Sequence, residues 1–246
     1  MLNELKVEMQ NLKNSKKAKI LSRFFKTGKG EYGEGDNFFG INVPEQRKLA
    51  KKYYDLNLDE IQKLLSSNIH EYRMTALFIL VDKYQKADNK EEIVNLYLKN
   101  TKNINNWDLV DLTAPNILGN HLLLTSKHSM QLSTSKHSMQ LPNRNILYSL
   151  ANSNNLWEKR IAVLSTFAFI RNNQFEDSLK IAEILLKDKH DLIHKAVGWM
   201  LREIGKRDLK TEEAFLARHC SAMPRTMLRY AIEKFDERKR KFYLSN

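Results

Sequence analysis

Hydrophobic residues recur at helical spacing along most of the chain. Apolar side chains stand three and four positions apart in one segment after another, a period that is typical of a helix with one buried face. Short polar stretches separate the segments. The pattern predicts helices over residues 2–13, 16–27, 44–55, 58–67, 70–87, 90–101, 106–122, 143–153, 155–172, 175–188, 190–207, 211–222 and 224–240. We therefore expect an all-α chain made of helical hairpins.

A short motif also repeats at a fixed distance in the second half of the chain. A basic residue precedes small or apolar residues three times, 35 and then 34 positions apart, at Arg160-Ile161-Ala162, Lys195-Ala196-Val197 and Arg229-Tyr230-Ala231. A period in the mid-thirties is the length of a two-helix solenoid unit. Each unit can bury its apolar stripe only against its neighbours. Residues 1–246 are therefore expected to form a single domain, a curved helical-repeat solenoid.

Two features interrupt the regular pattern. Pro115 lies inside the helix expected over 106–122, and its missing N–H and bulky ring predict an end or a kink one or two turns after Asp111. Further on, Thr125–Leu132 recurs without change as Thr134–Leu141, with Ser133 between the copies. A short turn would suffice between two helices, so this polar duplication predicts an exposed, mobile loop at about 125–142.

Helix-breaking residues gather in one place. The chain has eight Gly and four Pro, and five of the Gly fall within residues 28–40. Gly28 to Gly33 spells GxGxxG, but the motif follows a helical pattern and no βαβ unit surrounds it, which excludes a dinucleotide site. We expect residues 28–42 to form an ordered loop, with Tyr32, Phe38 and Phe39 as anchors.

Composition narrows the class of protein. No apolar run reaches the length of a membrane span, and the N-terminal residues lack a signal-peptide core. The lone Cys220 cannot form an internal disulfide, which agrees with a reducing compartment. We therefore expect a cytoplasmic protein without a membrane partner.

The charge balance points to a polyanionic partner. Lys and Arg number 41 against 29 Asp and Glu, for a net charge of +12. Such an excess favours nucleic acid as the partner, and a solvated Lys-rich surface is the alternative.

Familiar catalytic and metal-binding signatures are missing from the sequence. His190 and His194 stand four apart, as metal ligands can, but no third ligand accompanies them in a known spacing. The chain has no P-loop, no GxSxG elbow and no Cys–His nucleophile pattern. We expect a surface pair of histidines, no metal and no organic cofactor.

Three predicted helices each carry a tryptophan close to a charged residue. Trp107 and Asp111 are four residues apart, so they project from one helix face. Trp157 with Arg160 and Trp199 with Arg202 form comparable pairs. Taken singly, such residues are more often a core indole and a solvated charge. As a set they favour a basic groove that places Arg on phosphates and indoles against sugars.

Four segments together resemble the bacterial alkylpurine DNA glycosylases of the AlkD type, which are built from HEAT-like repeats. The similarity runs over nearly the whole chain and is strongest from Trp107 to Glu203. It rests on Gly40-Ile41-Asn42-Val43-Pro44 with Arg47, Asn106-Trp107-Asp108-Leu109-Val110-Asp111, Leu156-Trp157-Glu158-Lys159-Arg160 and Lys195-Ala196-Val197-Gly198-Trp199-Met200-Leu201-Arg202-Glu203. The resemblance implies a HEAT-like solenoid with a basic concave face, acting as a monomer in the bacterial cytoplasm, at the nucleoid.

The resemblance also implies an activity and residues to carry it out. The family hydrolyses the N-glycosidic bond of N3- and N7-alkylated purines in duplex DNA, without flipping the base into a pocket. Carried over by position, Asp111 stabilises the cationic sugar and positions water, Trp107 and Trp199 pack against the deoxyribose, and Arg160 contacts the backbone. Trp157, Lys159 and Arg202 are secondary candidates for DNA contacts.

One position departs from the best-known branch of the family. That branch has a Tyr near its cleft where this chain has Phe24, and Tyr32 in the Gly-rich loop is the other candidate for that role. The Gly-rich loop and the duplication differ as well, which leaves the lesion preference open. Some HEAT-like relatives bind without cutting, so the alternative function is a non-catalytic module that binds nucleic acid or protein.

Overall fold

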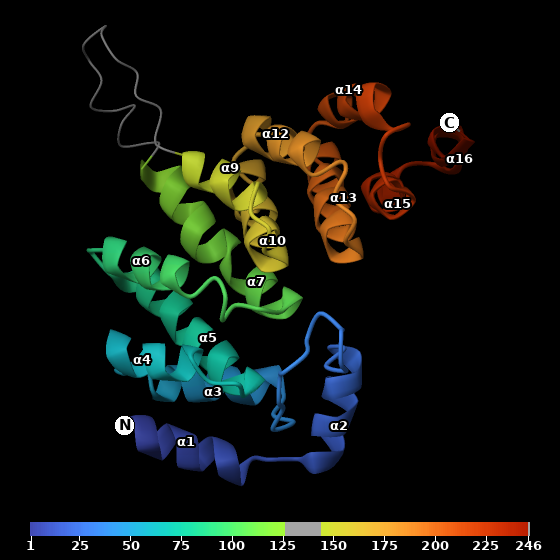
Figure 1. Ribbon diagram of the computed structural model, residues 1–246. Coiled ribbons are helices and arrows are strands. Elements are labelled where there is room, and N and C mark those ends of the chain that lie inside the picture. The colour runs from blue at the N-terminus through green and yellow to red at the C-terminus, as the bar shows by residue number, and fades with distance from the viewer. Residues whose placement is uncertain (126–143, 246) are drawn as a thin grey trace, which may run out of the picture. The chain divides into compact units, whose positions relative to one another are not determined.

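The described part of the chain is helical throughout. The computed structural model describes residues 1–125 and 144–245, and within these ranges it contains helices and no strand (Figure 1). The one β-type pairing there is an isolated bridge between Asn37 and Ile69. The predicted all-α, helical-repeat fold is confirmed. None of the described helices combines the length and the apolar character that crossing a membrane would take.

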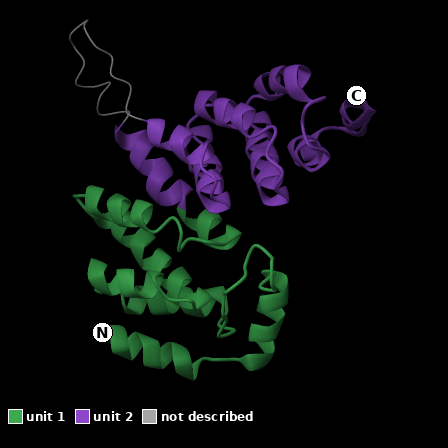
Figure 2. Ribbon diagram, in the orientation of Figure 1, with its two compact units in different colours: residues 1–113 green, residues 114–246 purple. Residues whose placement is uncertain are grey.

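Contacts within the chain define two compact units, residues 1–113 and 114–246 (Figure 2). The first unit contains α1 (Leu2–Asn11), α2 (Ser15–Phe24), α3 (Val43–Lys52), α4 (Leu58–Leu65), α5 (His70–Lys86), α6 (Glu91–Lys99) and α7 (Trp107–Thr113). The second contains η1 (Pro115–Gly119), α9 (Asn145–Ala151), α10 (Leu156–Ser165), α11 (Phe167–Ile170), α12 (Glu176–Ile184), α13 (Asp191–Gly205), α14 (Leu209–His219), α15 (Arg225–Ala231), η2 (Ile232–Lys234) and α16 (Glu237–Ser245). The single domain and the basic concave face stay predictions.

Asparagine side chains start three helices of the first unit. Asn14, Asn42 and Asn57 each accept a backbone N–H from the first turn of α2, α3 and α4, which satisfies a donor that has no partner within the helix. Asn57 and Glu60 form a full capping box. Helix α5 is the centre of this unit, because it contacts α3, α4, α6 and α7 and all of its first eleven residues are buried.

The Gly-rich segment is an ordered loop, as the sequence predicted. Phe39 is buried, and Phe38 stacks on Phe25 with ring centroids 5.2 Å apart. Gly40 has φ +84°, and a Cβ there would lie 2.3 Å from the carbonyl oxygen of Asn14. Only glycine fits this backbone conformation and this close approach. The loop is therefore fastened to the start of α2.

Pro115 interrupts its helix differently from the expectation. Helix α7 ends at Thr113, and a π-helical turn follows in which the Gly119 N–H bonds the Ala114 carbonyl oxygen at 2.9 Å. Helical backbone then continues over residues 120–125. A wider turn accommodates the missing N–H of proline, so the helical path goes on past it. The duplicated copies begin at Thr125, and the rest of them lies outside the described residues.

Two predicted helices are each divided in the structure. The helix expected over 155–172 breaks at Thr166, whose hydroxyl bonds the Val163 carbonyl at 2.6 Å, and gives α10 and α11. The helix expected over 224–240 ends in η2, and α16 starts afresh after Asp236. The Asp236 carboxylate accepts the N–H of Lys239 at 2.9 Å, which is the geometry of a helix N-cap.

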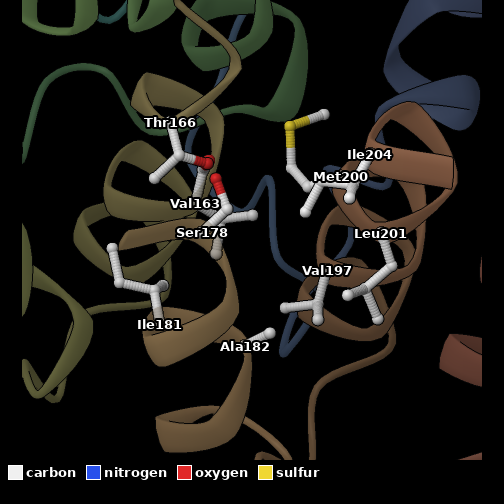
Figure 3. Close-up of a pocket in the computed structure, with 9 residues that line it drawn as sticks. All are labelled: Val163, Thr166, Ser178, Ile181, Ala182, Val197, Met200, Leu201 and Ile204. Atoms are coloured by element: carbon white, nitrogen blue, oxygen red, sulfur yellow. The ribbon is translucent and has the colours of Figure 1, made fainter. Parts of the chain in front are cut away.

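Helix α13 is the centre of the second unit. It contacts α10, α11, α12, α14 and α15. Side chains of α10, α12 and α13 face one another across a crevice too narrow to hold a water molecule (Figure 3). At Gly198 a Cβ would lie 2.4 Å from the Met227 carbonyl oxygen, so α13 and α15 pack backbone against backbone there. The side chains along this crevice belong to the hydrophobic core, and the crevice has no room for a ligand.

Candidate functional site

The candidate residues divide between the two units. Phe24, Tyr32, Trp107 and Asp111 belong to the first, and the second holds Trp157, Lys159, Arg160, Trp199 and Arg202.

Helix α7 presents the pair that the sequence singled out. Trp107 is its first residue and Asp111 lies one turn later, so both side chains leave the same face, and both are half-buried. Beneath the helix, Tyr97 is fully buried, and its hydroxyl lies 3.2 Å from that of Thr113. Burial raises the pKa of Tyr97, and the charge of Asp111 raises it further. The Asp111 carboxylate is thus close enough to the buried Tyr97 hydroxyl for its charge to affect that group.

Aromatic rings surround Trp107. Phe25 stacks on it with centroids 5.3 Å apart and 28° between planes, and Phe24 meets it edge-on at 5.9 Å. Phe25 is buried, whereas Phe24 is 60 % exposed. The structure therefore brings Phe24, Trp107 and Asp111 together in one region. Tyr32 is half-buried in the Gly-rich loop, and its role stays a prediction.

A buried ionic network next to Trp107 was missed by sequence reasoning. His70, at the start of α5, places Nδ1 3.1 Å from Asp36 and Nε2 2.9 Å from Asp108. Arg73 donates to the other oxygen of Asp36 at 2.7 Å. Burial disfavours the protonated ring, but the hydrogen bonds with Asp108 and Asp36 outweigh it and raise the pKa of His70 to about 9. His70 and Arg73 likewise hold the pKa of Asp36 below its usual range against the effect of burial.

An apolar pocket of about 360 Å³ adjoins this network within the first unit. Its walls come from α2, the Gly-rich loop and the first turns of α3, α5 and α7. The lining residues are Lys17, Ile20, Leu21, Phe24, Phe25, Phe38, Gly40, Ile41, Asn42, Val43, Gln46, His70, Glu71, Met74 and Asp108. No local motif could have signalled it, because five separate segments contribute to its walls.

In the second unit, Arg160 and Trp157 are buried at the start of α10. Arg160 is 5 % exposed and donates to the Leu192 carbonyl oxygen at 2.5 Å. Trp157 is 6 % exposed, which matches the alternative of a core indole. Between them along the chain, Lys159 forms an ion pair with Asp188 at 2.7 Å. These contacts fix the start of α10 against the first turn of α13 and the segment before it.

Trp199 occupies a more open position on α13. It is half-buried, and its ring centroid lies 5.9 Å from that of Phe167. Arg202, on the next turn, forms an ion pair with Glu233. Trp199 thus packs beside one ring and keeps part of its surface exposed.

The two histidines noted from the sequence have structural partners. His190 caps α13 by accepting the N–H of Leu192 at 3.1 Å, and a ring nitrogen of His194 lies 2.5 Å from the Asp188 carbonyl oxygen. Burial lowers the pKa of His190. Among the described residues, no group of three or more His, Cys, Asp and Glu side chains is placed to hold a metal ion.

The fold and these side chains define an all-α helical-repeat protein that presents an indole and a carboxylate together on one helix. Residues 5–235 match the family model described as DNA alkylation repair enzyme, so the chain belongs to that family. Membership assigns it a role in DNA repair.

One solved structure shows how far the similarity of fold extends. A chain described as a predicted DNA alkylation repair enzyme from Enterococcus faecalis superposes with a TM-score of 0.70 at 17 % identity, over 92 % of this chain and 97 % of the other. At this identity the likeness shows the fold alone. A search of curated proteins found no match.

Proposed function

We propose that this protein is a DNA glycosylase that hydrolyses the N-glycosidic bond of N3- and N7-alkylated purines in duplex DNA. The observation that carries the proposal is the pair on α7, where Trp107 and Asp111 share one half-buried face beside the exposed ring of Phe24. Family membership supports a repair role, and the pair supplies the chemistry.

The reaction needs a fixed negative charge near the sugar. An alkylated purine that already carries positive charge departs as a neutral base and leaves an oxocarbenium-like deoxyribose. A carboxylate held opposite that sugar lowers the barrier electrostatically, and it can orient the attacking water. In this proposal Asp111 is that carboxylate. The indole face of Trp107 attracts the same positive charge and contacts the sugar.

The second unit contributes DNA contacts in this proposal. Arg160 is the proposed phosphate contact. Its guanidinium is directed by the hydrogen bond to the Leu192 carbonyl and the residue is only 5 % exposed, so a phosphate would have to approach at its small exposed edge. Trp199, half-buried beside Phe167, offers an indole to a deoxyribose. We propose further that the protein acts as a monomer in the bacterial cytoplasm and uses no metal or organic cofactor.

Base release from methylated duplex DNA tests this function directly. We would measure release of 7-methylguanine and 3-methyladenine by the wild type and by Asp111→Asn at one fixed salt concentration. The substitution preserves shape and removes the charge, so release should fall by roughly a hundredfold or more. DNA binding should be preserved, because the basic residues that contact the backbone are unchanged.

An exposed carboxylate in the same unit provides the control. Asp55 is exposed, and Asp55→Asn should release bases at the wild-type rate. Equal release by the wild type and by Asp111→Asn would overturn the role of Asp111. No release by any variant, with DNA binding intact, would favour the non-catalytic binding module.

A further inference from the structure

His70 lies between two carboxylates in the core of the first unit. Its side chain is 3 % exposed, and each of its ring nitrogens faces an oxygen, that of Asp36 at 3.1 Å and that of Asp108 at 2.9 Å. A neutral imidazole has one N–H and cannot donate to both, whereas an ionised carboxylate only accepts. With both carboxylates ionised, each ring nitrogen must donate, so the ring is the doubly protonated cation.

Charged groups from three elements surround this ring. Asp36 lies on the Gly-rich loop and Asp108 on α7, and α5 itself adds Arg73, which bonds Asp36, and Glu71. Glu71 is occupied elsewhere, because its carboxylate accepts the backbone N–H groups of Phe39, Gly40 and Ile41. With a neutral His70, the buried Asp36 would keep Arg73 as its cationic partner, and Asp108 would lose the cationic ring that it contacts, at considerable cost.

His70 is linked to Trp107 in two ways. Asp108 directly follows Trp107 in the first turn of α7, so the bond from His70 fixes the residue next to the indole. The His70 ring also stacks on Phe38 at 4.6 Å and lies 5.1 Å from Phe25, and Phe25 in turn stacks on Trp107. The hydrogen bond from His70 to Asp108 and the ring contacts through Phe25 thus both constrain the position of the Trp107 indole.

We propose that His70 is a positioning residue that holds Trp107, and with it the Trp107–Asp111 face of α7, in the geometry for reaction. This inference rests on the proposed glycosylase function for its consequence in catalysis. The structural half of it, the control of Trp107 by the charged imidazole, stands independently of any activity.

Fluorine NMR of protein labelled with 5-fluorotryptophan tests the structural half. The chain has three Trp, so three resonances can be assigned with single Trp→Phe variants. In the wild type the Trp107 resonance should stay constant at neutral pH and shift as His70 deprotonates near pH 9. In His70→Gln it should already be displaced at neutral pH and should not titrate, while the Trp157 and Trp199 resonances stay in place.

A second histidine in a similar setting serves as the control. His219 lies 3.3 Å from a carboxylate oxygen of Glu183 and 4.6 Å from the Phe215 ring, in the second unit. His219→Gln should leave the Trp107 resonance unchanged. If His70→Gln does not fold, Asp108→Asn removes one partner and should displace the Trp107 resonance. A Trp107 resonance that is unaffected in the folded variant, and constant to pH 10 in the wild type, would overturn the inference.

Single-turnover base release tests the catalytic half. Displacement of Trp107 should slow release by roughly tenfold to a hundredfold in His70→Gln and leave DNA affinity within about twofold. Wild-type release with an unchanged rate in His70→Gln would contradict positioning. Absence of release by the wild type would instead contradict the proposed function, and the NMR result would still decide whether His70 controls Trp107.

Discussion

At the scale of single residues, buried charges organise both units. Glu71 is 1 % exposed and ties down the loop through three backbone N–H groups, while His70 joins that loop to α7. Sequence spacing was enough to pair Trp107 with Asp111, because they stand one turn apart on one helix. It could not pair His70 with Asp36 and Asp108, which are 34 and 38 residues away. Such contacts depend on how distant segments pack, which local periodicity does not encode.

A buried acid in the second unit makes stability depend on pH. Glu212 is 1 % exposed, and burial, reinforced by Glu213, raises its pKa to about 8 from the ordinary 4.5. Between these values the folded state keeps a proton that the unfolded state has lost, so stability falls as the pH rises from about 4.5 to about 8. Glu212→Gln should remove this dependence and stabilise the protein at pH 8 by on the order of a few kcal/mol.

Urea unfolding at pH 5 and pH 8 measures this effect. The Glu176 side chain is 79 % exposed, so Glu176→Gln serves as the control and should leave both values nearly unchanged. If Glu212→Gln lowered the free energy of unfolding at pH 8, burial of the Glu212 carboxyl group would not be what destabilises the wild type at that pH.

At the scale of elements, helical periodicity predicted most helices well, and the errors have local causes. The break at Thr166 carries no Gly or Pro, so nothing in the apolar pattern marks it. The break before α16 does carry a signal, since Asp236 is a helix-capping residue type. At Pro115 the expected interruption occurs, but a π-turn lets the helical path continue. A period alone cannot distinguish these outcomes.

Helices α13 and α15 pack closely at Gly198, so a larger side chain there should destabilise the fold. An added Cβ would meet the Met227 carbonyl at 2.4 Å and the Tyr230 Cβ at 2.6 Å, so α13 and α15 must separate to admit it. Gly198→Ala should therefore lower the free energy of unfolding by about 1–3 kcal/mol, despite the better helix propensity of Ala. Thermal and urea unfolding would show the loss.

Gly28 offers a matched comparison. A Cβ there would meet only the flexible carboxylate end of Glu31, at 2.8 Å. Gly28→Ala should change stability little, because that side chain can move away. If Gly198→Ala proved as stable as the wild type, the backbone contact between α13 and α15 would be looser than the structure indicates.

At the scale of the whole molecule, the net charge of +12 accounts for the expected affinity for DNA and says little about chemistry. Composition and repeat spacing were sufficient to predict the all-α repeat fold, since both follow from the sequence alone. The apolar pocket of the first unit was beyond prediction, because its walls exist only after five segments have assembled.

The charge balance makes binding sensitive to salt. If the protein neutralises roughly six phosphates, its affinity for duplex DNA should fall about a thousandfold between about 50 and about 200 mM salt. Fluorescence anisotropy with a labelled duplex measures this slope. Asp111→Asn should give the same slope as the wild type, because the counterions released come from the backbone contacts. A flat salt dependence would argue against an electrostatic interface.

Two neighbouring phenylalanines differ in how freely they can vary. Phe24 touches Trp107 with most of its surface in solvent, whereas Phe25 is 6 % exposed and stacks on Trp107 and Phe38. Mutation of Phe24 changes the exposed surface beside the Trp107 indole without disturbing the core. Mutation of Phe25 removes a buried ring that stacks on that indole. A lineage, or a laboratory library, can therefore change the surface beside the Trp107 indole through a single codon, while the adjacent codon stays under constraint.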